Sequence, residues 1–139
     1  MIKLLLASHG DLADGICSSL KIIMGEQSNI KTLCAYMKED FDLRKEISII
    51  LEDLSDEDKL IVVTDIFGGS VNNEFMNYLN KKNLYLISGL NLPLVIELVT
   101  ISDENDIERG VIKALENSKN SIQYCNAIIK SLNQEEDTF

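Results

Sequence analysis

Short apolar runs alternate with amphipathic segments along most of the chain. Four of the runs have the length of buried strands, and they cover residues 2–7, 31–36, 60–64 and 84–87. In the segments between them, apolar residues recur every three or four positions, which is typical of helices that pack one face against a core. Strands separated by such helices indicate βαβ units. We therefore predict an α/β fold with a doubly wound, mostly parallel four-stranded sheet in the order 2-1-3-4 and helices on both faces.

Residues with capping side chains stand where several helices should begin. Four of them precede or open an apolar helical pattern: Asp11, Ser70, Asn91 and Ser102. Each is predicted to cap a helix N-terminus through a side-chain oxygen. Pro93 fits the first turn after Asn91, because a backbone N–H at that position would have no partner within the helix.

The pattern weakens after residue 120. Apolar residues between 121 and 133 fit neither the helical nor the strand period, and residues 134–139 have the composition of an acidic, solvated tail. We therefore predict one domain over residues 1–120 and a C-terminal extension over residues 121–139. The apolar runs are much shorter than a membrane span, and the first residues lack the features of a signal peptide. The expected location is the cytoplasm.

An excess of acidic residues limits the ligands that the protein should bind. The chain has 23 Asp and Glu against 13 Lys and Arg, which gives a formal net charge of -10. This charge opposes binding to a phosphate backbone, so we expect no nucleic-acid ligand and favour basic protein partners. Cys17, Cys34 and Cys125 lack a C-x-x-C spacing, which indicates neither a disulfide framework nor a zinc site. They are interpreted as small buried residues.

The only histidine of the chain, His9, follows the first predicted strand beside a glycine. In the strand order 2-1-3-4, ligands bind beyond the carboxyl ends of strands 1 and 3, and those ends carry His9 and Asp65. Asp65 could accept a hydrogen bond from one ring nitrogen, which would fix the tautomer and leave the other nitrogen as a nucleophile. On position alone, a structural histidine and a turn-forming aspartate remain open interpretations.

A Gly-Gly-Ser sequence at residues 68–70 follows closely and predicts a place for an anion. Gly68 and Gly69 let the backbone approach a ligand, and Ser70 stands at a helix N-terminus, where free N–H groups suit a phosphoryl group. A tight turn with a serine cap is the simpler alternative. Three further hydroxyl residues at the strand ends are expected to line the same cleft: Ser8, Thr64 and Ser88.

Other chemistries that use these residue types fit the sequence less well. A serine hydrolase of the G-x-S-x-G type would need a different sequence from the Gly-Gly-Ser-Val-Asn at residues 68–72. The P-loop pattern of nucleotide-binding proteins is missing. A receiver domain would need acidic residues where the first strand ends in Ser-His-Gly, and a histidine phosphatase would need further histidines and an arginine. One histidine without grouped ligands also predicts no metal site.

Three linked motifs resemble a known family. The first is Ala-Ser-His-Gly at residues 7–10 with Ala-Asp-Gly at 13–15, the second is Thr-Asp-Ile-Phe-Gly-Gly-Ser at 64–70, and the third is Ser-Gly-Leu-Asn-Leu-Pro at 88–93. Together they resemble the EIIA domains of the mannose family in the phosphoenolpyruvate-dependent sugar phosphotransferase system. The motifs stand in the right order and on the right predicted elements.

This resemblance implies a phosphoryl carrier. His9 would accept a phosphoryl group from the histidine phosphocarrier protein HPr and pass it to a histidine of an EIIB protein or domain. Asp65 would orient the ring, and Gly68, Gly69 and Ser70 would surround the phosphoryl group. The donor is itself a protein, so no metal or nucleotide cofactor is implied. The family also implies a homodimer and an indirect association with the membrane components EIIC and EIID.

Two alternatives stay open at this point. Phosphoryl-donor subunits of dihydroxyacetone kinases resemble this family in fold and in the strand-1 histidine, although the signature at residues 65–70 favours the sugar transporters. A non-catalytic regulatory module that is phosphorylated on His9 is the second alternative. The resemblance does not identify the sugar, because selectivity in the family resides in the membrane components.

Overall fold

The computed structural model describes residues 1–81 and 83–137, and within them it contains a four-stranded sheet in the order β2-β1-β3-β4. The strands are β1 (Ile2–His9), β2 (Ile30–Ala35), β3 (Lys59–Thr64) and β4 (Leu84–Ser88). All three strand pairings are parallel. The strand order and fold class predicted from the sequence are confirmed, and each predicted strand is found at its expected place.

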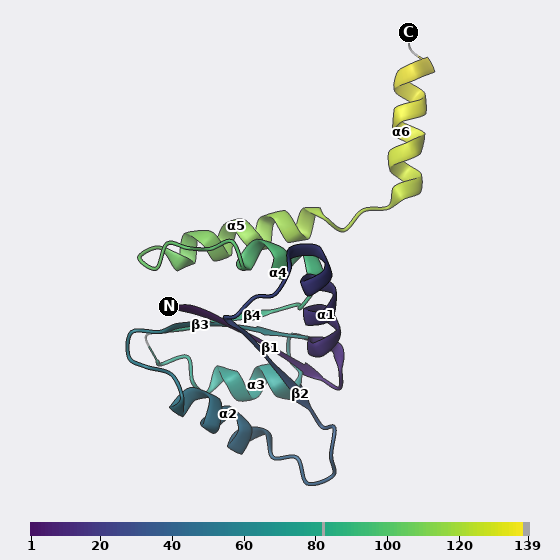
Figure 1. The fold of residues 1–139 in the computed structure, drawn as a ribbon. Coiled ribbons are helices and arrows are strands. Elements are labelled where there is room, and N and C mark those ends of the chain that lie inside the picture. The colour runs from purple at the N-terminus through teal and green to yellow at the C-terminus, as the bar shows by residue number, and fades with distance from the viewer. Residues whose placement is uncertain (82, 138–139) are drawn as a thin grey trace.

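Helices cover both faces of the sheet (Figure 1). In the described residues they are α1 (Leu12–Met24), α2 (Leu43–Glu52), α3 (Ser70–Met76), α4 (Leu92–Leu98), α5 (Ile107–Asn120) and α6 (Cys125–Asp137). The α1, α4 and α5 helices lie over one face, and α2 and α3 lie over the other (Figure 1). Side chains of β1 alternate between the two cores, with Leu4 and Leu6 in one and Leu5 and Ala7 in the other. Burial on both faces explains why the central strands are almost uniformly apolar.

The carboxyl ends of β1, β2 and β3 meet at one edge of the sheet. His9 lies opposite Ala35 in the pairing of β1 with β2, and β3 runs parallel to β1 on its other side and ends at Thr64. The residues that follow these neighbouring strands, Tyr36 and Asp65, are therefore brought close to His9. From the strand order, we expect a ligand to bind at this edge of the sheet.

One predicted side-chain cap is confirmed, and at another predicted helix start a different residue makes the capping hydrogen bond. Asn91 caps α4 as predicted, because its side-chain oxygen accepts a hydrogen bond from a first-turn N–H at 2.9 Å, and Pro93 lies in the same turn. Asp11 stands at the N-cap position of α1, but within the described part of the chain its side chain makes no capping hydrogen bond. Ser8 takes this role from β1, since its hydroxyl oxygen accepts from the Ala13 N–H at 2.9 Å.

Two predicted caps are wrong. Ser70 is the first residue of α3, and the N-cap is Gly69, which has extended backbone. The Ser70 hydroxyl can therefore bond outside its helix. Ser102 does not open α5, whose cap is Asp106. The chain instead turns between Asp103 and Asp106, where the Asp106 N–H donates to the Asp103 C=O at 3.2 Å, because short acidic side chains favour turns and caps over a helical first turn.

The C-terminal extension contains a helix, which the sequence pattern does not predict. The α6 helix projects away from the sheet (Figure 1). It includes residues 134–137 of the expected acidic tail. Residues 138–139 of that tail lie outside the described residues. The segment contains no glycine or proline, and Ile128, Ile129 and Leu132 follow a helical spacing. These three side chains remain exposed, so no buried face signalled the helix.

The cysteines are less buried than predicted. Cys17 and Cys34 are half-buried, and Cys125 is exposed because it lies on the projecting α6 helix. The prediction of three small buried residues is therefore wrong for Cys125. None of the helices in residues 1–81 and 83–137 combines the length and hydrophobicity that a membrane span requires.

Candidate functional site

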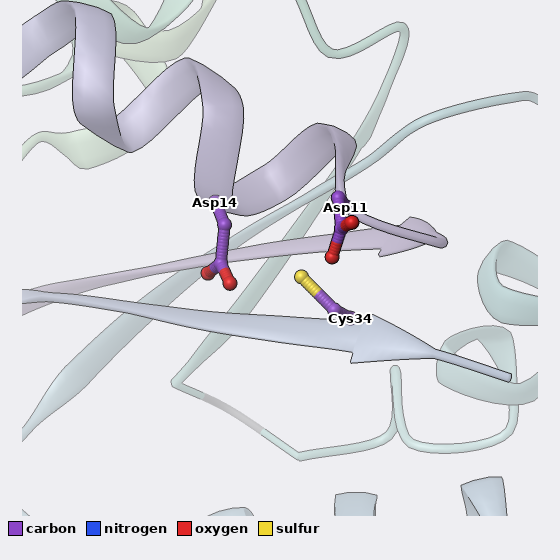
Figure 2. A group of neighbouring side chains, drawn as sticks. All are labelled: Asp11, Asp14 and Cys34. Atoms are coloured by element: carbon purple, nitrogen blue, oxygen red, sulfur yellow. The ribbon is translucent and has the colours of Figure 1, made fainter. Parts of the chain in front are cut away.

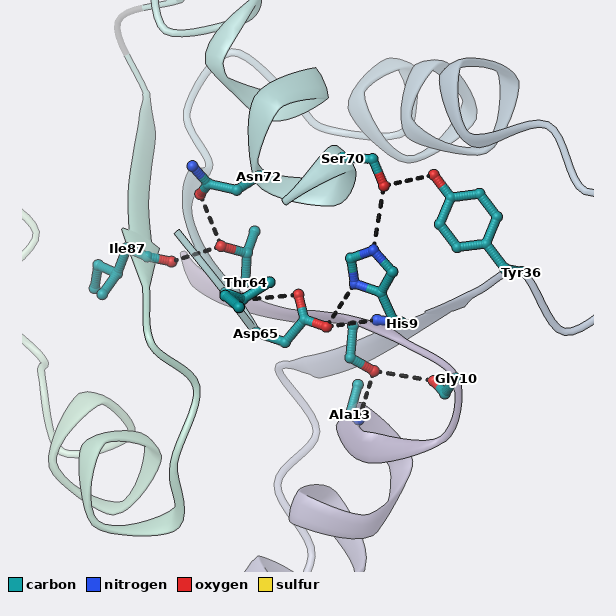
Figure 3. A network of polar contacts seen from close by, with 11 residues as sticks. His9, Gly10, Ala13, Tyr36, Thr64, Asp65, Ser70, Asn72 and Ile87 are labelled. Carbon is teal, nitrogen blue, oxygen red and sulfur yellow. Dashed lines mark hydrogen bonds and ion pairs between the residues drawn. The ribbon is translucent and has the colours of Figure 1, made fainter. Parts of the chain in front are cut away.

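The His9 ring is held at the end of β1 by Asp65 (Figure 3). Its Nδ1 lies 2.8 Å from the Asp65 Oδ2, and the His9 backbone N–H donates to the same oxygen at 2.7 Å. The His9 side chain is 43% exposed, whereas the Asp65 side chain is only 11% exposed. Asp65 thus fixes the ring from the protein side while part of the imidazole faces solvent.

The charge of Asp65 decides which nitrogen of His9 carries the proton. Partial burial would raise the pKa of the Asp65 carboxyl, but the hydrogen bonds from the His9 backbone and ring outweigh burial and hold this pKa below its usual value. At neutral pH the carboxylate is ionised and can only accept hydrogen bonds. Nδ1 must then be the donor, so Nε2 of the neutral imidazole carries the lone pair.

Two hydroxyl groups lie beyond Nε2 (Figure 3). The Ser70 Oγ is 3.2 Å from the His9 Nε2, and the Tyr36 hydroxyl is 2.8 Å from the Ser70 Oγ. The Tyr36 ring also packs against the imidazole, with the two centroids 5.5 Å apart. The sequence predicts Ser70 here but not Tyr36. A polar aromatic residue at the end of the second predicted strand, which neighbours strand 1 in the predicted order, is the signal that could have identified Tyr36.

Glycine lets the β3–α3 loop lie against the His9 ring. A Cβ on Gly69 would be 2.7 Å from the Ile66 Cγ2 and 3.3 Å from the His9 Cε1, so a side chain at this position would displace its neighbours. Gly68 has a φ of +83°, in the left-handed region that favours glycine. The close approach in the structure is that of Gly69 to the imidazole and to Ile66, and the approach of Gly68 and Gly69 to a ligand stays a prediction.

The other predicted hydroxyl residues lie beneath the site. Ser8 and Thr64 are fully buried, so neither lines an open cleft. The Ser8 hydroxyl donates to the Gly10 C=O at 3.0 Å and supports the turn after β1. The Thr64 hydroxyl donates to the Asn72 Oδ1 at 2.7 Å and connects β3 to α3. The Ser88 hydroxyl is buried and has no hydrogen-bond partner among the described residues.

A second group of polar side chains lies at the start of α1 (Figure 2). Asp11, Asp14 and Cys34 each place one oxygen or sulfur atom within 4.8 Å of the others, a grouping that the sequence does not predict because it depends on how α1 packs on β2. Burial raises the pKa of the Cys34 thiol, so the sulfur is protonated at neutral pH. Asp11 and Asp14 are both exposed, and exposed acidic groups are common without a bound ion.

Comparison with known families identifies one that spans most of the chain. The family model EIIA-man, described as the PTS system fructose IIA component, matches residues 3–116. The fructose-specific EIIA component of the phosphotransferase system (PTS) from Bacillus subtilis is 24% identical over 140 residues, which cover 97% of this chain and 96% of that relative.

Solved structures give the same relationship. A protein from Klebsiella pneumoniae, proposed to be a phosphoenolpyruvate-dependent sugar phosphotransferase system permease, has a TM-score of 0.88 and 45% identity, with 92% of this chain and 93% of that chain covered. The PTS IIA protein associated with the fucose utilization operon of Streptococcus pneumoniae has a TM-score of 0.74 and 26% identity, with 92% and 96% covered. As the motif resemblance predicts, the chain belongs to the EIIA-man family and is an EIIA component of the sugar phosphotransferase system.

Proposed function

We propose that this protein is a phosphoryl carrier that accepts a phosphoryl group from phospho-HPr on the Nε2 of His9 and passes it to a histidine of EIIB. The observation that carries the proposal is the 2.8 Å contact between the His9 Nδ1 and the ionised Asp65. In the neutral imidazole this contact leaves Nε2 unprotonated on a partly exposed ring, which is the form that can attack phosphorus.

The proposed transfer is an in-line displacement at phosphorus. The lone pair of the His9 Nε2 attacks the phosphorus of the donor phosphohistidine, the N–P bond of the donor breaks, and its electron pair returns to the donor imidazole. The His9 ring then bears a positive charge, with Nδ1 still protonated. Asp65 accepts the Nδ1–H bond throughout and stabilises this charge. Attack by a histidine of EIIB on the new phosphohistidine completes the relay.

Residues 68–70 are proposed to surround the phosphoryl group. The Ser70 hydroxyl lies 3.2 Å from Nε2, so its hydrogen can turn from the ring nitrogen to a phosphoryl oxygen. Gly68 and Gly69 add no side chains to the loop beside the imidazole. No metal or nucleotide has a role in this step, because the donor is a phosphorylated protein.

The surroundings of His9 suit a protein partner. Large apolar side chains are exposed on the elements that carry the site, and they are Leu12, Met37, Ile66 and Phe67, the last of them 81% exposed. Exposed aromatic residues and methionine are enriched at protein interfaces. The net charge of -10 favours a basic partner surface. We place the successive docking of HPr and EIIB here.

Further features predicted from the sequence pattern or implied by the family belong to the same proposal. They are a homodimer, an indirect association with EIIC and EIID, a cytoplasmic location, and the division of the chain into residues 1–120 and 121–139. The exposed apolar side chains of α6, namely Ile128, Ile129 and Leu132, support a contact with another chain.

The proposal is tested by incubating the protein with phosphoenolpyruvate, enzyme I and HPr and measuring intact mass. Wild-type protein should gain the mass of one acid-labile phosphoryl group, and His9→Ala should gain none while keeping its circular dichroism spectrum. Addition of EIIB should then discharge the wild-type protein. No gain in wild type when HPr is charged, or an equal gain in His9→Ala, would contradict the proposal.

A further inference from the structure

Tyr36 is held in an unusual conformation beside His9. Its φ is +65°, a left-handed backbone that side-chain-bearing residues adopt at a cost in free energy. The ring lies between two others, 5.5 Å from the imidazole of His9 and 5.4 Å from the ring of Phe41, measured between centroids. A strained backbone persists where surrounding contacts fix it, and here those contacts lead to the nucleophile.

Hydrogen bonds join Asp65, His9, Ser70 and Tyr36 in a chain (Figure 3), and the charge of Asp65 determines which group donates in each of them. The ionised Asp65 only accepts, so the His9 Nδ1 donates to it, and in the neutral imidazole Nε2 then accepts. Ser70, 3.2 Å from Nε2, uses its single hydroxyl hydrogen for that bond. The Ser70 oxygen can then only accept from the Tyr36 hydroxyl, 2.8 Å away. The hydrogens thus run from Tyr36 to Ser70 and from Ser70 to His9.

We propose that Tyr36 is a positioning residue for phosphoryl transfer, whose hydroxyl aims Ser70 at the Nε2 of His9 before transfer and at the phosphoryl oxygens after it. This inference rests on the proposed function of His9. Tyr36 acts through Ser70, because its hydroxyl contacts the serine oxygen. When Nε2 becomes phosphorylated, the Ser70 hydrogen rotates to a phosphoryl oxygen while the bond from Tyr36 stays in place. Hydrogen bonds in such chains strengthen one another.

The test compares Tyr36→Phe, Ser70→Ala and the double variant in their rate of phosphorylation by phospho-HPr. Tyr36→Phe keeps the ring and removes only the hydroxyl, and we expect the rate to fall roughly three- to tenfold, the effect of losing one neutral hydrogen bond. The double variant should be no slower than Ser70→Ala, because the Tyr36 hydroxyl acts on Nε2 only through its hydrogen bond to Ser70. Tyr124→Phe removes an exposed tyrosine hydroxyl beyond α5 and should leave the rate unchanged.

A second readout needs no phosphoryl donor. His9 is the only histidine, so its ring nitrogens give unambiguous ¹⁵N resonances. In Tyr36→Phe at neutral pH, the Nε2 resonance should move toward that of a nitrogen without a hydrogen bond, while Nδ1 stays protonated. An unmoved Nε2 resonance, a wild-type rate in Tyr36→Phe, or losses that multiply in the double variant would overturn the inference. Failure of wild-type protein to be phosphorylated would instead overturn the proposed function, and this inference with it.

Discussion

The two nitrogens of His9 have different roles because Asp65 bonds to only one of them. A free imidazole exchanges its proton between Nδ1 and Nε2, whereas the 2.8 Å contact with an ionised carboxylate keeps the proton on Nδ1. The same carboxylate would face the positive charge that the ring acquires in the proposed phosphorylation. Its contribution to transfer therefore depends on its negative charge as well as on its hydrogen bond.

Asp65→Asn separates these two contributions. The amide oxygen can still accept the Nδ1–H bond, but the charge is lost, so phosphorylation of His9 by phospho-HPr should slow about tenfold, the difference between a hydrogen bond to a charged group and one to a neutral group. Rapid-quench measurement of phosphoprotein against time gives the rate. Asp56→Asn, an exposed carboxylate in the loop before β3, should behave as wild type. An unchanged rate in Asp65→Asn would show that Asp65 is only structural.

Sequence reasoning identifies His9, Asp65 and Ser70 because each stands at a readable boundary between elements. It misplaces the Ser70 hydroxyl, since a serine before a helical pattern is usually a cap, whereas here Gly69 caps α3. The place of Tyr36 at the end of strand 2 is readable in the sequence, but its contacts with His9 and Ser70 are missed for a tertiary reason. The left-handed φ of +65° and the direction of the ring depend on contacts with residues distant in sequence, which no local pattern encodes.

At the scale of elements, Asp58 connects the start of β3 to β1 through an ion pair with Lys3, at the edge of the sheet opposite His9. Its Oδ2 lies 2.9 Å from the Lys3 Nζ and accepts the Ser55 N–H at 3.2 Å. The hydrogen bond from Lys3, followed by that from Ser55, lowers the pKa of Asp58 from 3.8 to about 2. The folded state thus favours the ionised form more than the unfolded state does. This contribution to stability is present above pH 3.8 and is lost as the pH falls through about 2.

Asp58→Asn should therefore destabilise the fold at neutral pH and change its response to acid. Urea unfolding should show a lower unfolding free energy for the variant at pH 7, with the difference from wild type shrinking as the pH falls from 3.8 to about 2. Glu57→Gln removes the neighbouring exposed carboxylate and should keep the acid response of wild type. A difference between wild type and Asp58→Asn that stays constant over this range would contradict the assignment.

The elements differ in how far the sequence predicts them. The strands and α1 to α4 carry buried periodic faces, and their order follows from the rules for parallel sheets. The α6 helix lacks a buried face, because its apolar side chains are exposed, and the sequence pattern therefore indicates neither a helix nor a strand there. The start of α5 is displaced because Asp103 and Asp106 form a turn that consumes the first residues of the expected helix.

At the scale of the whole molecule, the doubly wound sheet places all reactive groups at one edge. The strands supply His9 and, at their ends, Tyr36 and Asp65, while the β3–α3 loop and the start of α3 supply Gly69 and Ser70. The same edge carries exposed apolar side chains, and the chain as a whole is acidic. This arrangement suits a carrier that meets two protein partners in turn at one open histidine, rather than an enzyme that encloses a small substrate.

The most direct test of this account locates the phosphoryl group on the His9 ring. Uniformly ¹⁵N-labelled protein would be phosphorylated through enzyme I and HPr, and the phosphorus–nitrogen coupling would be measured by NMR. Because the chain has one histidine, the coupled nitrogen is assigned without ambiguity. We predict coupling of phosphorus to Nε2, with Nδ1 still protonated and bonded to Asp65. Phosphorus on Nδ1, or on no histidine nitrogen, would contradict the account.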